Sequence, residues 1–247
     1  MYTFSTLPVE IVYRIMDHQN KLTLFCSMQN ISQRLNQILS TYERYRTLTT
    51  LTLTHNEIGD EGAQRIADAL RTNTTLITLD LGDNQIDAGG AQHIADVLRI
   101  NRTLTTLNLN SNQIGDKGEQ YIVDVLRMNT TLTTLGLDYN KISGGGAQRF
   151  ADLLRTNTTL ITLDLGVNRI GDVGAQHIAD VLRTNTTVAT LNLHRNEIGD
   201  LGARHFADAL RTNTTLTTLY LAANRIGYEE ARHIADALCW NAGVNMV

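Results

Sequence analysis

Apolar side chains recur at fixed positions along this chain from Leu48 onward, and polar side chains fill the positions between them. The recurring frame is L-x-x-L-x-L-x-x-N-x-I-G-D-x-G-A-x-x-I-A-D-x-L-R-x-N-T-T, with a period of 28 residues. Seven copies follow one another, starting at Leu48, Leu76, Leu104, Leu132, Leu160, Val188 and Leu216. A fixed period of this length predicts a solenoid, in which stacking buries a core that one copy cannot bury alone.

The first part of each copy predicts a short strand that ends in a turn. In the first copy, Leu51-Thr52-Leu53 alternates apolar and polar side chains, as a strand with one buried face does. Asn56 follows, and an asparagine recurs at this position in every copy. A buried asparagine there can donate to and accept from backbone groups that the turn would otherwise leave unpaired.

The second part of each copy predicts a helix, which in the first copy runs from about Glu61 to Arg71. Its apolar face has helical spacing and consists of Ala63, Ile66, Ala67 and Leu70. Gly59 permits the turn before the helix, and Asp60 is placed to cap it. Because helices are wider than strands, stacking the copies curves the solenoid and places a parallel sheet on its concave face.

An Asn-Thr-Thr or Asn-Arg-Thr sequence follows each of the first six predicted helices and matches the acceptor pattern for N-glycosylation. The asparagines are Asn73, Asn101, Asn129, Asn157, Asn185 and Asn213. We interpret the recurrence as structural, because asparagine tolerates the left-handed conformation in which helices commonly end.

Composition and charge narrow the classes of function. The chain is 42% hydrophobic and 19% charged, with a net charge of −4, and it has no basic run, so a nucleic-acid partner is not expected. No apolar stretch approaches the ~18 residues of a membrane span, and residues 1–8 lack the pattern of a secretory signal. Cys26 and Cys239 stand near opposite ends and are expected to be unpaired. These features predict an intracellular protein, cytoplasmic or nuclear.

The segment Asn56-x-Ile58-Gly59-Asp60-x-Gly62-Ala63 resembles the leucine-rich repeats of the ribonuclease-inhibitor type, also found in NOD-like receptors and Ran GTPase-activating proteins. The resemblance covers Leu48 to about Val244. It implies an α/β fold, a curved solenoid of seven strand–helix repeats in a domain that spans residues 47–247.

Residues 1–46 do not follow the repeat and predict a separate unit of three short helices. The Leu-Pro-x-Glu sequence at 7–10, followed by these helices, resembles an F-box. The resemblance implies docking to a Skp-type adaptor of a cullin ubiquitin ligase through Leu7, Pro8, Ile11, Ile15 and Phe25. A second interpretation stays open, in which the helices only cap the exposed core of the first repeat.

Comparison of the copies with one another locates a candidate binding surface. Core positions barely change, whereas positions on or just after the strand, expected on the concave face, differ from copy to copy. Diversity on a rigid scaffold indicates recognition of a protein partner. The predicted partner-binding residues are Asp80, Asp83, Asp138, Tyr139, Lys141, Asp164, Arg169, His194, Arg195, Tyr220 and Arg225.

Charge is distributed unevenly over these variable positions. The first two copies carry acidic residues: Glu57, Asp80 and Asp83. The last four copies carry basic residues: Lys141, Arg169, Arg195 and Arg225. Tyr139 and Tyr220 are possible aromatic anchors. A partner with a basic segment followed by an acidic one would complement this field.

The sequence contains no phosphate-binding loop, nucleophile elbow or carboxylate pair in a defined cleft, so we expect no enzyme activity and no cofactor. Histidines share one helix position in four copies, at His93, His177, His205 and His233. Neighbouring helices pack roughly 8–10 Å apart, too far to share a metal ion with ligands at ~2.0–2.1 Å, so no metal site is expected.

The leading hypothesis is a substrate receptor of a cullin-type ubiquitin ligase, monomeric apart from its partners, with a target protein on its concave face. One alternative is a stand-alone recognition or scaffold protein with a helical cap. Another alternative is a GTPase-activating protein, which would need an exposed catalytic Arg or Asn.

Overall fold

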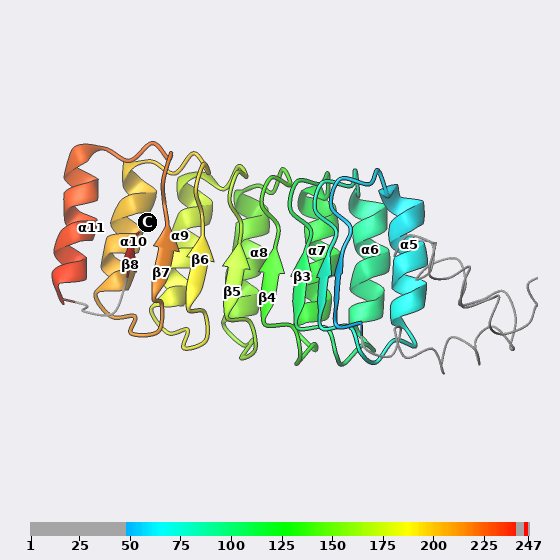
Figure 1. Cartoon of the computed structure of the whole chain (residues 1–247). Helices are drawn as coiled ribbons and strands as arrows, with labels where there is room; N and C mark the ends of the chain where they lie inside the picture. Colours follow the sequence, from blue (N-terminus) through cyan, green and yellow to red (C-terminus); the bar gives the residue numbers. More distant parts are fainter. Residues whose placement is uncertain (1–47, 241–244, 247) are drawn as a thin grey trace, which may run out of the picture.

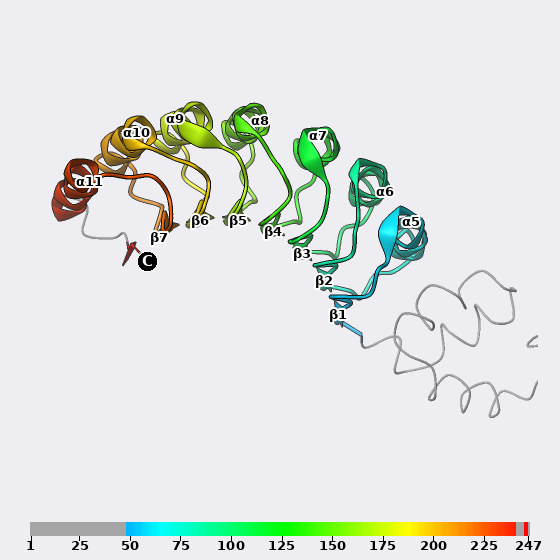
Figure 2. The same cartoon turned by 90° about the horizontal axis from the view of Figure 1, so that it is seen from above.

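The eight short strands form one parallel sheet on the inner side of a curved solenoid (Figures 1 and 2). The structure is a computed structural model that describes residues 48–240 and 245–246. The three helices and the adaptor contacts predicted for residues 1–46 lie outside the described residues. The strands are β1 (Thr50–Thr52), β2 (Thr78–Asp80), β3 (Thr106–Asn108), β4 (Thr134–Gly136), β5 (Thr162–Asp164), β6 (Thr190–Asn192), β7 (Thr218–Tyr220) and β8 (Asn245–Met246).

The strands lie in sequence order, each paired with the next. Thr50 pairs with Thr78 and Leu51 with Leu79, and the same offset continues from β1 to β7. The seven predicted strands are therefore confirmed. β8 is an addition that the seven-copy frame does not predict, and its Met246 pairs with Leu219 of β7.

One helix follows each strand from β1 to β7 and lies on the outer side of the arc (Figure 2). The helices are α5 (Gly59–Leu70), α6 (Ala88–Leu98), α7 (Gly115–Leu126), α8 (Gly144–Leu154), α9 (Gly171–Leu182), α10 (Asp200–Leu210) and α11 (Tyr228–Trp240). The leucines of the frame fill the space between the two layers, and Leu51, Leu79 and Leu107 are fully buried. Each repeat adds such a layer of leucines to one continuous core.

The asparagine after each strand ties its repeat to the one before it. The Asn140 side chain is fully buried, and its Nδ2 donates to the carbonyl oxygens of Leu109 at 2.9 Å and Asp138 at 3.0 Å. Its Oδ1 accepts from the Ile114 amide at 3.3 Å. The predicted role of this asparagine is confirmed, and we call this column the strand-end ladder: Asn84, Asn112, Asn140, Asn168, Asn196 and Asn224.

A second column of asparagines corrects the interpretation of the Asn-Thr-Thr sequences. The helices end in right-handed residues such as Arg127, and none of these asparagines has a positive φ. Instead Asn157 Nδ2 donates to the Leu126 carbonyl of the preceding helix at 3.0 Å, and its Oδ1 accepts from the amides of Thr159 and Leu160. We call this column the helix-end ladder: Asn101, Asn129, Asn157, Asn185 and Asn213. These side chains are buried, so glycosylation does not fit them.

The predicted capping of a helix by its own Asp60 is wrong. Helix α5 begins without a side-chain cap, after Ile58, and Gly59 has a φ of +57°. Asp60 Oδ1 accepts instead from the Asp87 amide of the next repeat at 2.9 Å. Asp116 and Asp172 make the equivalent bond to the following repeat. The aspartate therefore links neighbouring repeats.

A buried charge lies between helices α7 and α8. Glu119 stands where the six other repeats have alanine: Ala63, Ala91, Ala147, Ala175, Ala203 and Ala231. Its side chain is fully buried, and Oε2 accepts from Arg149 Nε at 2.8 Å. Oε1 has no hydrogen-bond partner among the described residues. Burial raises the pKa of Glu119 to about 7, although Arg149 acts in the opposite direction.

Replacing Asn140 with leucine is expected to lower the free energy of unfolding by ~1–3 kcal/mol, because buried backbone groups at Leu109, Ile114 and Asp138 lose their partner. The control is Gln148→Ala at an exposed helix position, which is expected to change the free energy of unfolding by less than ~0.5 kcal/mol. Urea denaturation measures both variants. Equal unfolding midpoints and slopes would contradict the role of the strand-end ladder.

Replacing Glu119 with glutamine is expected to change how stability depends on pH. The folded pKa lies above the unfolded value of 4.5, so the contribution of Glu119 is fully present below 4.5 and is lost as pH rises through about 7. The free energy of unfolding of Glu119→Gln, relative to that of wild type, should therefore rise by ~1–3 kcal/mol between pH 4.5 and pH 7.5. Denaturation at both pH values checks this, and a difference that is constant with pH would contradict it.

Candidate protein-binding surface

The outward positions of the strands form one row across the concave face. The last residues of the paired strands lie side by side: Thr52, Asp80, Asn108, Gly136, Asp164, Asn192 and Tyr220. This row includes three of the predicted site residues: Asp80, Asp164 and Tyr220. The structure thus places them on the predicted face, in a surface whose backbone is fixed by the sheet.

A second row lies two residues further on and includes the predicted residues Asp138 and His194. His194 Nε2 lies 3.6 Å from Asp138 Oδ2, although the two residues belong to repeats that are not neighbours. The repeat between them contributes Gly166, and a Cβ there would lie 2.4 Å from both side chains. Gly166 therefore provides the space for this pair. His194 Nδ1 lies 3.0 Å from Asn192 Oδ1, which orients the ring.

A similar contact spans Gly136. Asn110 Nδ2 donates to Asp164 Oδ2 at 3.4 Å, and Asn110 Oδ1 accepts from the Asp138 amide at 2.8 Å. A Cβ at Gly136 would lie 2.7 Å from Asn110 Oδ1. Partial burial and, secondarily, the nearby Asp164 raise the pKa of Asp138, while His194 lowers it. The centre of the concave face is therefore a hydrogen-bonded polar surface with two carboxylates.

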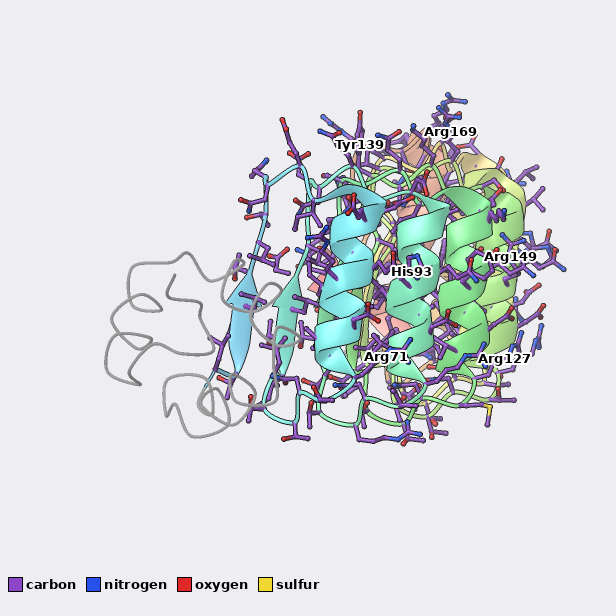
Figure 3. The ribbon with its side chains drawn as sticks, turned by 90° about the vertical axis from the view of Figure 1, so that its right-hand side faces the viewer. Arg71, His93, Arg127, Tyr139, Arg149 and Arg169 are labelled. Atoms are coloured by element: carbon purple, nitrogen blue, oxygen red, sulfur yellow. The ribbon has the colours of Figure 1, made fainter. Side chains whose placement is uncertain are left out.

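The remaining predicted residues lie just after the strands, as their place in the repeat frame indicates. They occupy the loops that join strand ends to helix starts, on either side of the strand-end ladder. Figure 3 shows Tyr139 and Arg169 at this edge of the solenoid, away from Arg71 and His93 on the helices. We call this edge the loop rim, and its predicted residues are Asp83, Tyr139, Lys141, Arg169, Arg195 and Arg225.

The backbone of the loop rim is unusual and fixed. Tyr139, Lys141 and Arg195 have φ values of 53°, 61° and 51°, in the left-handed region that non-glycine residues seldom adopt. The asparagine between the first two, Asn140, holds this turn by its bonds to the core backbone. The rim side chains therefore project from a rigid edge, and all four cations on it are exposed.

The cations on the helices differ from those on the loop rim. Arg71, Arg99 and Arg155 each pair with the aspartate three residues earlier, at 3.3, 3.8 and 3.6 Å. Within residues 48–240, by contrast, Lys141, Arg169 and Arg195 have no carboxylate within 4.0 Å. Arg225 pairs with Glu197 at 2.9 Å. The rim of repeats 4 to 6, which start at Leu132, Leu160 and Val188, thus carries positive charge that no ion pair among the described residues neutralises.

The described residues contain no group of three or more His, Cys, Asp or Glu side chains that could hold a metal ion. Nor does any described helix have the length and apolar composition needed to cross a membrane. Two features of the structure were missed from sequence. They are the spacer glycines Gly136 and Gly166 and the buried Glu119. Gly136 and Glu119 each differ from every other residue in their columns, whereas Gly166 shares its column with Gly82.

The parallel sheet, the outer helices and the strand-end ladder define a leucine-rich repeat protein. Residues 9–144 match the model of the TMOD/LMOD leucine-rich domain, and residues 156–179, 184–207 and 212–231 match that of the leucine-rich repeat. The first match covers more than half of the 247 residues, and the chain belongs to the TMOD/LMOD leucine-rich domain family. The TMOD/LMOD match also covers most of the segment that resembles an F-box.

The solved structures that the chain is similar to include one described as leiomodin-1 actin-binding site 2. It is 20% identical, the match covers 84% of this chain and 86% of that chain, and the TM-score is 0.42. Another is the tropomodulin C-terminal domain of Caenorhabditis elegans, at 14% identity, with 62% and 93% coverage and a TM-score of 0.51. At 14% identity, the likeness to the tropomodulin domain concerns the fold alone. No curated protein matches the chain.

Proposed function

We propose that this chain is a protein-binding module, without catalytic activity, whose concave face and loop rim together hold a partner protein. One observation carries the proposal. The side chains that vary from repeat to repeat stand on backbone that the sheet and the strand-end ladder fix, as at Asn140. A surface with constant backbone and variable side chains suits recognition, because binding does not have to order the loops first.

The size and charge of the surface support a protein partner. Seven strands at the usual spacing span about 29 Å, which suits a protein rather than a small molecule. Asp138 and Asp164 make the concave centre acidic, and Lys141, Arg169 and Arg195 make the neighbouring rim basic. A partner that presents both signs of charge in this arrangement would be favoured over partners that do not.

A more specific role is recognition of substrates for a cullin-type ubiquitin ligase. Its support is the resemblance of Leu7-Pro8-x-Glu10 and the following segment to an F-box. In that role the N-terminal helices hold a Skp-type adaptor and the repeats hold the target protein. The competing role is that of a repeat domain with an N-terminal cap, which the TMOD/LMOD match from residue 9 favours. Actin is a defined partner to test, since the leiomodin-1 structure is described as an actin-binding site.

Binding energy is expected to concentrate on Tyr139, Arg169, Arg195 and Tyr220, because tyrosine and arginine supply large contact area and directional donors. Alanine at all four positions should abolish capture of a partner that the wild-type chain retains from cell lysate. The matched control carries alanine at His177 on a helix and at Arg99, Arg127 and Arg155 at helix ends. Arg149 is unsuitable as a control, since it holds the buried Glu119.

Quantitative mass spectrometry compares the proteins retained by the three chains. Proteins retained by wild type and control but lost by the four-alanine variant are the expected result. Loss from the helix variant with retention by the four-alanine variant would show that the variable positions are not the binding surface. Purified actin is tested in parallel in a direct binding assay.

The adaptor hypothesis predicts that the chain co-purifies with a Skp-type adaptor and that Ile11→Glu abolishes this. Circular dichroism should show that the repeats remain folded, because their core is formed by residues from Leu48 onward. A Leu132→Ala variant, which weakens the repeat core, separates loss of binding from loss of folding. Absence of adaptor binding to the wild-type chain would leave the cap interpretation.

A further inference from the structure

The loop rim of repeats 4 to 6 has a fixed backbone, and it carries cations that form no ion pair with the described residues. Lys141, Arg169 and Arg195 are exposed, and no carboxylate of the described residues lies within ion-pair distance of them. The aspartates nearby are already engaged, since Asp172 accepts from the amides of Gly199 and Gly202. An uncompensated group of cations on a rigid edge favours an anionic partner.

Exposed apolar side chains lie beside these cations. Tyr139, in the loop of repeat 4, is 60% exposed. Val173 and Leu201, in the first turns of α9 and α10, are 65% and 61% exposed. Helix starts follow the rim loops directly, so Val173 lies four residues after Arg169. Each of repeats 4 to 6 therefore offers both a basic and an apolar side chain near this edge.

The exposed apolar side chains of the rim favour a protein segment over a nucleic acid. Covering exposed aliphatic side chains such as Val173 and Leu201 with apolar groups lowers the free energy. A phosphate backbone does not supply such groups. A polypeptide can supply carboxylates and apolar side chains together.

The spacing along the rim suits an extended segment. Neighbouring repeats are separated by ~4.8 Å at the strands and roughly 8–10 Å at the helices, and the rim lies between the two. In an extended chain, side chains on one face recur every ~6.6 Å. Carboxylates at every second residue would therefore meet cations from successive repeats, and the alternate side chains would face the apolar residues at the helix starts.

We infer that the loop rim of repeats 4 to 6 binds an extended acidic segment of a partner protein in which acidic and apolar side chains alternate. The inference rests on the proposed function and specifies the chemistry of the partner. Lys141, Arg169 and Arg195 contact the carboxylates, and Tyr139, Val173 and Leu201 contact the apolar side chains. The positive ends of the α9 and α10 helix dipoles add to the attraction.

The test uses the full chain and a fluorescent probe peptide of alternating glutamate and valine. Fluorescence anisotropy at low salt should show binding that weakens as salt rises. Arg169→Glu together with Arg195→Glu should weaken it about tenfold or more, and Val173→Ser with Leu201→Ser about threefold or more. The matched control, Arg99→Glu with Arg155→Glu, makes the same change in net charge on the helices and should change affinity less than about twofold.

Three further probes decide between the possible partners. Peptides that alternate glutamate with glycine or lysine with valine should bind more weakly than the glutamate–valine peptide, and a single-stranded thymidine oligonucleotide should not bind. Equal binding of the glycine peptide would overturn the apolar contacts. Tighter binding of the oligonucleotide, or equal effects of the rim and control charge reversals, would overturn the inference as a whole.

The same variants separate this inference from the proposed function. Suppose that Tyr220→Ala abolishes capture of a cellular partner while the two rim double variants retain it. The concave face would then bind the partner, the proposed function would stand, and the inference about the loop rim would be wrong. If no partner depends on either surface, both fail.

Discussion

The structure depends on the satisfaction of backbone groups where each strand turns toward its helix and each helix turns back toward the next strand. Such groups, if buried without partners, cost free energy comparable to a lost hydrogen bond. The two asparagine ladders supply those partners. Asn140 bonds to the Leu109 carbonyl of the preceding repeat, and Asn157 bonds to the Leu126 carbonyl at the end of the preceding helix. Each repeat is thereby fastened to its neighbour at both edges of the solenoid.

These ladders also make a variable surface possible. Since side-chain amides from the core hold the turns, the residues between them can differ without loss of the fold. That freedom is visible in the left-handed loop positions, where Asp83, Tyr139 and Arg195 share one conformation. The result is two adjoining surfaces of opposite charge, an acidic concave centre around Asp138 and Asp164 and a basic loop rim. Because the two surfaces are separate, one partner can contact carboxylates on the concave centre and cations on the rim.

The stacked architecture tolerates local exceptions because each repeat contacts only its neighbours. Glu119 places a carboxylate at a helix position that is alanine in the six other repeats, and Arg149 of the next helix donates to it. Such a pair is weak evidence for stability, since removing two charges from water offsets much of their attraction. One carboxylate oxygen has no hydrogen-bond partner among the described residues, and burial raises the pKa of Glu119 to about 7, so we expect the α7–α8 junction to respond to pH.

The sequence by itself determined the strands, the helices, the strand-end ladder and the choice of variable positions. The reason is that periodicity reports which side chains face the core, and stacking repeats that pattern seven times. It also identified the candidate site residues one by one, but not their division into two surfaces. That division depends on the residue at which each strand ends, and the residue types alone do not show where that is.

Only the tertiary structure decided which side chains bond to a neighbouring repeat. Ile-Gly-Asp occurs at residues 58–60 and again at 198–200, yet Gly59 has a φ of +57° and Gly199 one of −100°. The Gly199 turn differs because Asp172 of the preceding repeat binds the amides of Gly199 and Gly202. The helix-end ladder and the Glu119–Arg149 pair arise in the same way. Their partners lie about one repeat apart along the chain, beyond the reach of local propensity.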